Sequence, residues 1–217
     1  MKNKNKIVSI VLLIIYLIFG IMAFPNMDNV NNFNSLYYIV SAIFTLSFVL
    51  FFTKDDLKKE FKEFKKNIIK NLLYCFIIFI CMFLIVTLSN FLIDKLLGWE
   101  EINSSKLIFP NINSMFLYTL FVLLIYAPFI EGIIFTKIIK NIIKNKIAWI
   151  LISGILFGLL QIGFDFSSYS SLIFSLPYII IGILVSFIYE KKENVFYPIF
   201  IWFFYYLFQF FIQYMAI

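Results

Sequence analysis

The chain has 217 residues, of which 63% are hydrophobic and 14% are charged, and its mean hydropathy is +0.97. A soluble domain is roughly 45–50% apolar and about 25% charged, so this composition excludes a soluble enzyme, a nucleic-acid-binding domain and a secreted disulfide-bonded scaffold. The net charge of +6 fits basic cytoplasmic loops better than a nucleic-acid partner. The sequence has no histidine, and all 18 basic residues are lysines, which removes imidazole chemistry, most zinc sites and bidentate arginine recognition.

Seven apolar stretches are predicted to span a lipid bilayer, because a spanning helix needs about 20 mostly apolar residues. In chain order they are Ile7–Phe24, Leu36–Phe52, Leu72–Ile93, Met115–Phe135, Ile147–Phe164, Leu172–Tyr189 and Val195–Ile217. The first stretch follows three lysines, as a signal peptide would. It is longer than the apolar core of a signal peptide and no clear cleavage site follows it, so we expect a retained helix. The sequence therefore predicts an all-α fold, a polytopic membrane helical bundle that forms one integral membrane domain over residues 1–217.

The positions of the lysines predict the orientation of this bundle. Sixteen of the 18 lysines precede the first span or follow the second, fourth and sixth, and only Lys95 and Lys106 lie on the opposite side. Because basic loops stay in the cytoplasm, we predict the N-terminus inside and the C-terminus outside. The usage of lysine, asparagine and isoleucine is typical of an AT-rich bacterial genome, which predicts a multi-pass protein of a bacterial plasma membrane.

The basic segment 54–71 has an internal helical pattern. Its apolar residues recur at steps of four, three and four positions and form one stripe among the lysines: Leu57, Phe61, Phe64 and Ile68. Two interpretations stay open. The segment is either an amphipathic surface helix on anionic lipid, or a cytoplasmic hairpin whose lysines only set the topology.

Glu131 is the one acidic residue of the chain that lies within a predicted span. A charge at that depth costs roughly 2.5–3.5 kcal/mol, so the side chain must face protein or water, find a partner or keep its proton. Intramembrane carboxylates are by default candidates for functional sites. The alternative is a protonated glutamate that joins two helices through a single hydrogen bond.

Gln161 is the predicted partner of Glu131. The helix of Glu131 is expected to continue to about Lys144 and to turn near Asn145, which puts both residues roughly 20–25 Å along their helices from the turn. The amide of Gln161 can donate to a carboxylate. Pro128 lies one turn before Glu131 and is expected either to kink the helix and open a cavity, or only to serve helix packing.

Three stretches resemble, in order, the motifs of the CPBP family of intramembrane CAAX-processing and bacteriocin-processing proteases, also called Abi proteins. Residues 127–136 resemble the first motif, E-E-x-x-x-R. Residues 151–161 resemble the second, F-x-x-x-H, and residues 194–206 resemble the third, in which a histidine precedes an asparagine or aspartate by four positions. The resemblance covers residues 117–210 and defines a CPBP-like core over residues 115–211.

The resemblance implies a catalytic role for Glu131, which matches the first glutamate, and Phe157 matches the aromatic residue of the second motif. The second glutamate, the arginine, the two histidines and the asparagine are replaced in that order by Gly132, Thr136, Gln161, Trp202 and Tyr206. Family members are thought to activate water with the glutamate while histidines assist and stabilise the oxyanion. Glutamine and tyrosine can donate hydrogen bonds, but neither exchanges protons near neutral pH as histidine does.

Three functions follow from these observations. The first is a proteolytically impaired family member, a pseudoenzyme that binds another membrane protein or peptide as a scaffold or as a bacteriocin-immunity factor. The second is a divergent active protease that uses Glu131 with hydrogen bonds from Gln161 and Tyr206. The third is a small-molecule transporter or its substrate-binding membrane subunit, against which stands the lack of inverted repeats.

We expect no cofactor and no metal site, because a zinc site needs three or four ligands and only one carboxylate lies at depth. Cys75 and Cys81 are six residues apart in one apolar run, on different faces of a helix and too far apart for a disulfide.

Overall fold

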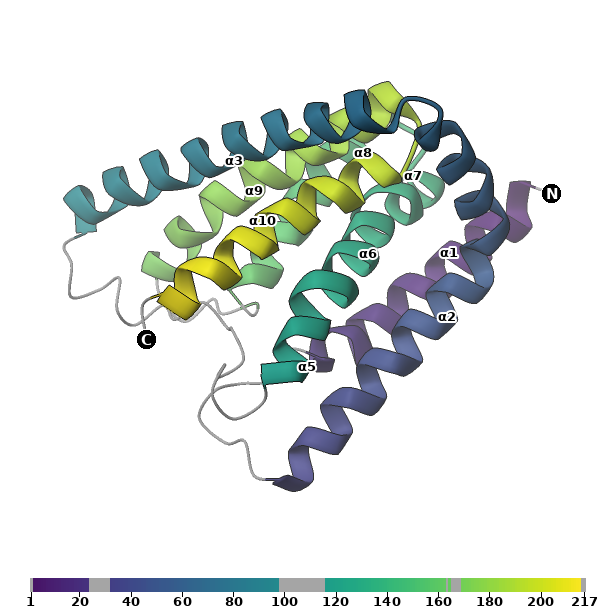
Figure 1. Ribbon diagram of the computed structural model, residues 1–217, viewed down its shortest axis with the longest axis horizontal. Coiled ribbons are helices and arrows are strands. Elements are labelled where there is room, and N and C mark those ends of the chain that lie inside the picture. Colours follow the sequence, from purple (N-terminus) through teal and green to yellow (C-terminus); the bar gives the residue numbers. More distant parts are fainter. Residues whose placement is uncertain (1, 24–31, 98–115, 163, 165–168, 216–217) are drawn as a thin grey trace.

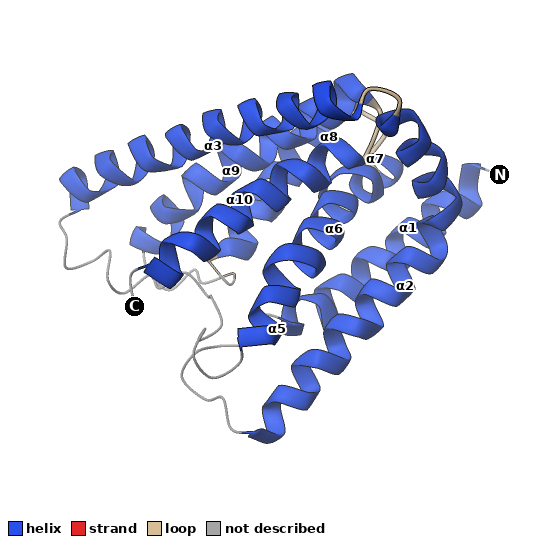
Figure 2. Ribbon diagram, in the orientation of Figure 1, coloured by secondary structure: helices blue, strands red, loops and turns tan. Residues whose placement is uncertain are grey.

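The computed structural model describes residues 2–23, 32–97, 116–162, 164 and 169–215. Within these residues the chain is helical and contains no strand (Figure 2). The predicted all-α fold is therefore confirmed. The predicted span ends at Phe24, Met115 and Ile217 lie outside the described residues.

The described residues form seven helical rods, and the first and fourth of these include tighter or wider turns. The rods are α1 (Lys2–Ile15) with η1 (Tyr16–Gly20) and η2 (Ile21–Ala23); α2 (Asn32–Lys65); α3 (Ile68–Leu97); α5 (Phe116–Phe121) with η4 (Val122–Tyr126), α6 (Ala127–Gly132), η5 (Ile133–Ile138) and α7 (Ile139–Ile142); α8 (Lys146–Gln161); α9 (Tyr169–Lys192); and α10 (Phe196–Met215).

Four rods contain segments that are long and apolar enough to cross a membrane, namely Tyr37–Lys65, Ile68–Leu96, Phe116–Ile142 and Tyr169–Lys192. The other three rods contain shorter apolar helices, namely Asn5–Gly20, Lys146–Gln161 and Phe196–Ile212. Helices of this length and hydropathy therefore require a lipid bilayer around them. That all seven rods cross it, with the N-terminus inside, remains a prediction.

The rods form two groups with the fourth rod between them (Figure 1). The α1 and α2 helices lie side by side in one group, and α3, α8, α9 and α10 form the other. Tyrosines of the fourth rod bind the end of the first: the hydroxyl of Tyr126 donates to the Gly20 carbonyl at 3.0 Å, and that of Tyr118 donates to the Ala23 carbonyl at 2.6 Å. The first apolar stretch therefore packs into the bundle.

Glycines bring α8 and α9 into backbone contact. A Cβ atom on Gly182 of α9 would lie 3.0 Å from the Cα of Gly154, and a Cβ on Gly158 would lie 2.8 Å from the backbone nitrogen of Ile179. Gly154 and Gly158 are four residues apart on α8, and small residues at this spacing let membrane helices approach closely. The α8 helix begins where the side chain of Asn145 accepts a hydrogen bond from the Ala148 amide at 3.0 Å, which confirms the predicted turn.

The basic segment 54–71 is the continuation of α2, a turn and the start of α3. Phe64 is buried and packs on Tyr197 and Phe200 of α10, with ring centroids 5.1 and 5.2 Å away. Phe61 and Ile68 are 41% and 37% exposed. This geometry favours the hairpin interpretation, because half of the apolar stripe packs on the bundle. Its location in the cytoplasm remains a prediction.

Candidate functional site

Glu131 lies in α6 and is only 1% exposed. Its carboxyl accepts a hydrogen bond from the hydroxyl of Tyr206 on α10, with 2.5 Å between the two oxygens. The intramembrane acid therefore has a protein partner and joins two helices.

Two π-helical turns flank the short helix that carries Glu131. In the first, the amide of Ala127 donates to the carbonyl of Val122, five residues earlier. Pro128 has no amide hydrogen and stands at the start of α6, where a proline is tolerated. A π-helical turn, a feature that is frequent at functional sites, thus precedes Pro128, while the kink and the cavity expected there remain predictions.

Hydroxyl groups from neighbouring helices stabilise the second π-helical turn. The Phe135 carbonyl accepts hydrogen bonds from Ser153 of α8 and, at 3.4 Å, from Ser186 of α9. The Ser186 hydroxyl also lies 2.9 Å from the Ser153 hydroxyl, and it shares its single hydrogen between that oxygen and the Phe135 carbonyl. Thr136, at the position of the motif arginine, is fully buried and donates to the carbonyl of Gly132 on its own helix. These bonds fix the direction of the chain after Glu131.

Gly132 permits the close crossing of α6 and α10. A Cβ atom at this position would lie 2.8 Å from Cγ1 of Ile199 and 3.1 Å from its backbone nitrogen. Contacts this short are not tolerated without movement, so any larger residue would separate the helices. Tyr206 follows Ile199 by two turns of α10, and the same crossing brings its hydroxyl to Glu131.

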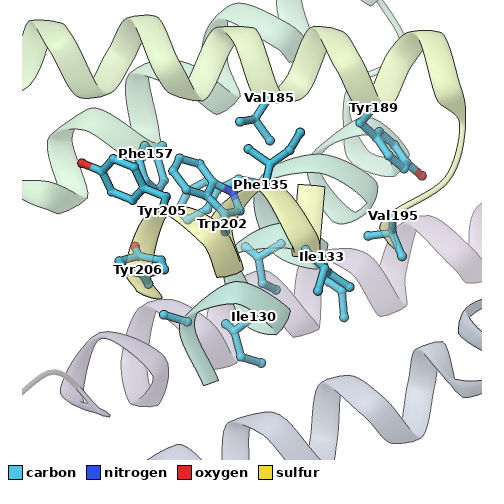
Figure 3. Close-up of a cluster of buried hydrophobic side chains, with 14 of the residues drawn as sticks. Ile130, Ile133, Phe135, Phe157, Val185, Tyr189, Val195, Trp202, Tyr205 and Tyr206 are labelled. Carbon is cyan, nitrogen blue, oxygen red and sulfur yellow. The ribbon is translucent and has the colours of Figure 1, made fainter. Parts of the chain in front are cut away.

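Aromatic stacking connects the second and third motif stretches. The rings of Phe157 and Trp202 stack with centroids 4.4 Å apart, and both side chains are 1% exposed. Trp202 lies 6.2 Å from Tyr206 and Phe157 lies 5.4 Å from Phe135, again between ring centroids. Figure 3 shows these residues in one cluster beside Ile130. The structure thus brings positions 131, 157, 202 and 206 together.

Gln161 is the last residue of α8 and is half-buried. Its side chain makes no hydrogen bond within the described part of the chain, so nothing here supports the predicted pairing with Glu131. Tyr206 is the observed partner instead. The catalytic role of Glu131 and the hydrogen-bonding role of Gln161 remain predictions.

Three further polar groups near the site are buried without a hydrogen-bond partner among the described residues: the Tyr16 hydroxyl, the Trp202 indole nitrogen and the Tyr205 hydroxyl. Tyr16 comes from η1 and packs its ring on Phe135, with 5.7 Å between the ring centroids. The sequence analysis missed Tyr16 because a tyrosine in an apolar run carries no distinct signal. Among the described residues, no group of three His, Cys, Asp or Glu side chains is placed to hold a metal ion.

The sequence analysis also missed a buried ion pair near the C-terminal end of α2. The ammonium of Lys137 lies 2.6 Å from Glu60 and 2.8 Å from Asp56. The second carboxylate oxygen of Glu60 accepts from the Val195 amide at 2.6 Å, and its backbone carbonyl accepts from the Asn194 side chain at 2.7 Å. This network connects α2, η5 and the start of α10. Two acids four residues apart on one helix, Asp56 and Glu60, were the available signal.

A second ion-pair network ties the neighbouring helix ends at the same end of the bundle. Lys140 lies 2.8 Å from Glu190 and 3.7 Å from Glu193, and Lys146 lies 3.4 Å from Glu190. These contacts hold α7, α8 and the end of α9 together, so the basic connections gather on one side of the bundle (Figure 1).

Comparison with known proteins agrees with the motif resemblance. Residues 113–208 match the family described as type II CAAX prenyl endopeptidase Rce1-like, and this segment contains Glu131, Phe157, Gln161, Trp202 and Tyr206. The UPF0177 protein YxdF of Lactococcus lactis subsp. lactis (strain IL1403) is 32% identical over 74 residues, which are 34% of this chain and 38% of that protein. No solved structure matches the chain. Residues 113–208, somewhat less than half of the chain, are thus similar to the Rce1-like family.

Proposed function

We propose that this protein, with its Rce1-like membrane domain, binds another membrane protein or peptide in a bacterial plasma membrane and has little or no peptidase activity. The enclosure of Glu131 supports this proposal. Its carboxyl is 1% exposed and hydrogen-bonded to Tyr206. Trp202, at the position of a motif histidine, stacks on Phe157 in the same cluster.

The chemistry of glutamate-activated hydrolysis explains why enclosure matters. The base must contact a water molecule, and a second group must carry a proton or stabilise the oxyanion. Tyr206 occupies one oxygen of Glu131, and the chain has no histidine to exchange protons. Each missing assisting group typically costs about 10²–10⁴-fold in rate, so several together leave little hydrolysis.

The packed frame is what a binding role requires. The three motif stretches are joined by one hydrogen bond and by stacked rings, so they form a rigid core for the lipid-facing helices. A protein that recognises a bacteriocin or a membrane partner needs such a core but needs no proton transfer. Immunity against a bacteriocin is the specific form of binding that we propose to test first.

The test separates binding from proteolysis. The purified protein is reconstituted in liposomes with prenylated CAAX-type and bacteriocin-leader-type peptides, and products are measured by mass spectrometry for the wild type, Glu131→Gln and Glu131→Ala. We expect no cleavage above protein-free liposomes. Cleavage that disappears in both variants would overturn the proposal and establish a divergent protease.

A growth assay tests the binding role directly. Expression in a bacteriocin-sensitive strain is expected to raise the inhibitory concentration of the bacteriocin, and Glu131→Gln, which preserves shape, is expected to retain that protection. Protection that requires an ionisable group at position 131, or ion flux that depends on it in the same liposomes, would favour catalysis or transport instead.

A further inference from the structure

We propose that the junction of α3, α9 and α10 binds the phosphate headgroup of an anionic phospholipid. We call this place the headgroup site and define it by Lys70, Tyr74, Lys192 and Tyr197. The inference rests on the placement of these side chains and is independent of the proposed function.

Two aromatic rings hold the ammonium group of Lys192 in place. Its nitrogen lies 4.4 Å from the ring centroid of Tyr74 on α3 and 5.2 Å from that of Tyr197 on α10. Tyr197 is fixed in turn, because its hydroxyl donates to Asn71 at 2.8 Å and the Asn71 amide donates to the Phe64 carbonyl at 2.7 Å. A cation held on a rigid platform presents its remaining N–H groups with little loss of entropy on binding.

The charge of this cation is not neutralised by the protein. Neither Lys70 nor Lys192 forms an ion pair among the described residues, although the neighbouring acids Glu190 and Glu193 do, with Lys140 and Lys146. Lys70 lies one helical turn before Tyr74 and therefore on the same face of α3. Glu63, which is exposed, is the one other acidic side chain on the adjoining turn of the chain. The headgroup site thus carries a net positive charge.

Apolar side chains continue from the lysines along α3. Leu73 and Ile77 follow Lys70 by three and seven residues and are 58% and 53% exposed, a surface suited to acyl chains. Two lysines next to an apolar strip match a phosphate joined to fatty chains, whereas a soluble phosphate would not need the strip. Basic pockets between membrane helices bind anionic lipid headgroups. Tyrosines are enriched at the membrane–water interface, which is where such headgroups lie.

Lys191 provides a matched control for the experiment. It is adjacent to Lys192, carries the same charge, makes no ion pair within the described chain and lies 4.6 Å over the ring of Phe187 instead of at the headgroup site. Lys192→Gln and Lys191→Gln therefore change net charge equally and differ only in position.

The experiment measures binding of phosphatidylglycerol and phosphatidylcholine to the full-length protein in detergent by native mass spectrometry. We expect phosphatidylglycerol to bind in preference to phosphatidylcholine. Affinity for phosphatidylglycerol should fall about five-fold in Lys192→Gln and about 25-fold in Lys70→Gln/Lys192→Gln, and less than about two-fold in Lys191→Gln.

Three results would overturn the proposal. They are equal losses in Lys191→Gln and Lys192→Gln, equal binding of the two lipids by the wild type, and displacement of the lipid by glycerol phosphate at lipid-equivalent concentration, which would reassign the site to a soluble phosphate ester. Lys192→Arg keeps the charge on the platform and is expected to retain binding, so a variant that fails to fold does not decide the test.

Discussion

Glu60 and Glu131 are both buried glutamates, yet their surroundings differ. Glu60, at the end of the bundle, is paired with Lys137 and accepts from the Val195 amide as well. Glu131, at depth, has one partner among the described residues, the neutral hydroxyl of Tyr206. A carboxylate with a charged partner and saturated oxygens ties helices together, whereas one with a single neutral partner keeps capacity for another role. The comparison separates an ion-paired glutamate from one whose partner is neutral, and a functional role for Glu131 remains a prediction.

Removal of the cation beside Glu60 should have the largest effect. Lys137→Met leaves a buried carboxylate without its counter-charge, and we expect a loss of about 3–5 kcal/mol in the free energy of unfolding. Thermal unfolding in detergent measures it. Lys140→Met is the control, since Lys140 is 29% exposed and Glu190 retains Lys146. Equal losses of unfolding free energy in Lys137→Met and Lys140→Met would show that the two ion-pair networks contribute equally to stability.

A methyl group at the crossing of α6 and α10 should have the next largest effect. Gly132→Ala places a Cβ atom against Ile199, and overpacking of this kind costs about 1–3 kcal/mol. The same unfolding assay measures the loss, and Ile199→Ala in the same chain should recover part of it because it removes Cγ1. A neutral Gly132→Ala would mean that the two helices are not held in close contact.

Removal of the hydroxyl that binds Glu131 should cost less. Tyr206→Phe keeps the ring on Trp202 but leaves a buried carboxyl oxygen without its donor, and we expect a loss of about 1 kcal/mol. Tyr16→Phe is the matched control, because the Tyr16 hydroxyl is buried without a partner and its removal should leave stability unchanged or higher. A larger loss for Tyr16→Phe would show that the roles of the two tyrosines are reversed.

The smallest expected effect is at the second π-helical turn. Ser153→Ala removes one donor to the Phe135 carbonyl while Ser186 remains in reach, so we expect about 0.6 kcal/mol, the average for hydrogen bonds between membrane helices. A Ser153→Ala/Ser186→Ala double variant should lose more than the sum of the single changes, since each serine can replace the other. Strict additivity would argue against this shared role.

Hydropathy and residue type were sufficient for much of the fold. The apolar stretches predicted the helical rods. The turn predicted near Asn145 is present before α8, where the asparagine side chain caps the helix. Glu131 was identifiable as a candidate because a single acid in an apolar run has few harmless explanations.

Partners across the bundle were not predictable from the same information. The number of residues between the turn and Gln161 predicted how far Gln161 lies along its helix, but not the direction in which its side chain points. The observed partner of Glu131 is Tyr206. The Glu60–Lys137 pair joins residues 77 apart in sequence, and seven lysines around Glu60 made its segment resemble a solvated surface. The π-helical turns were also missed, since hydropathy patterns assume a constant helical period.

The tight contact between Gly132 and Ile199 limits how this sequence can change. A glutamate at position 132, which the protease motif requires, would need α10 to move away and take Trp202 and Tyr206 with it. Histidines introduced at positions 161 and 202 would therefore leave an incomplete motif in an otherwise unaltered bundle. Introducing the full motif into this bundle therefore requires coordinated substitutions at Gly132 and on α10 instead of a single change.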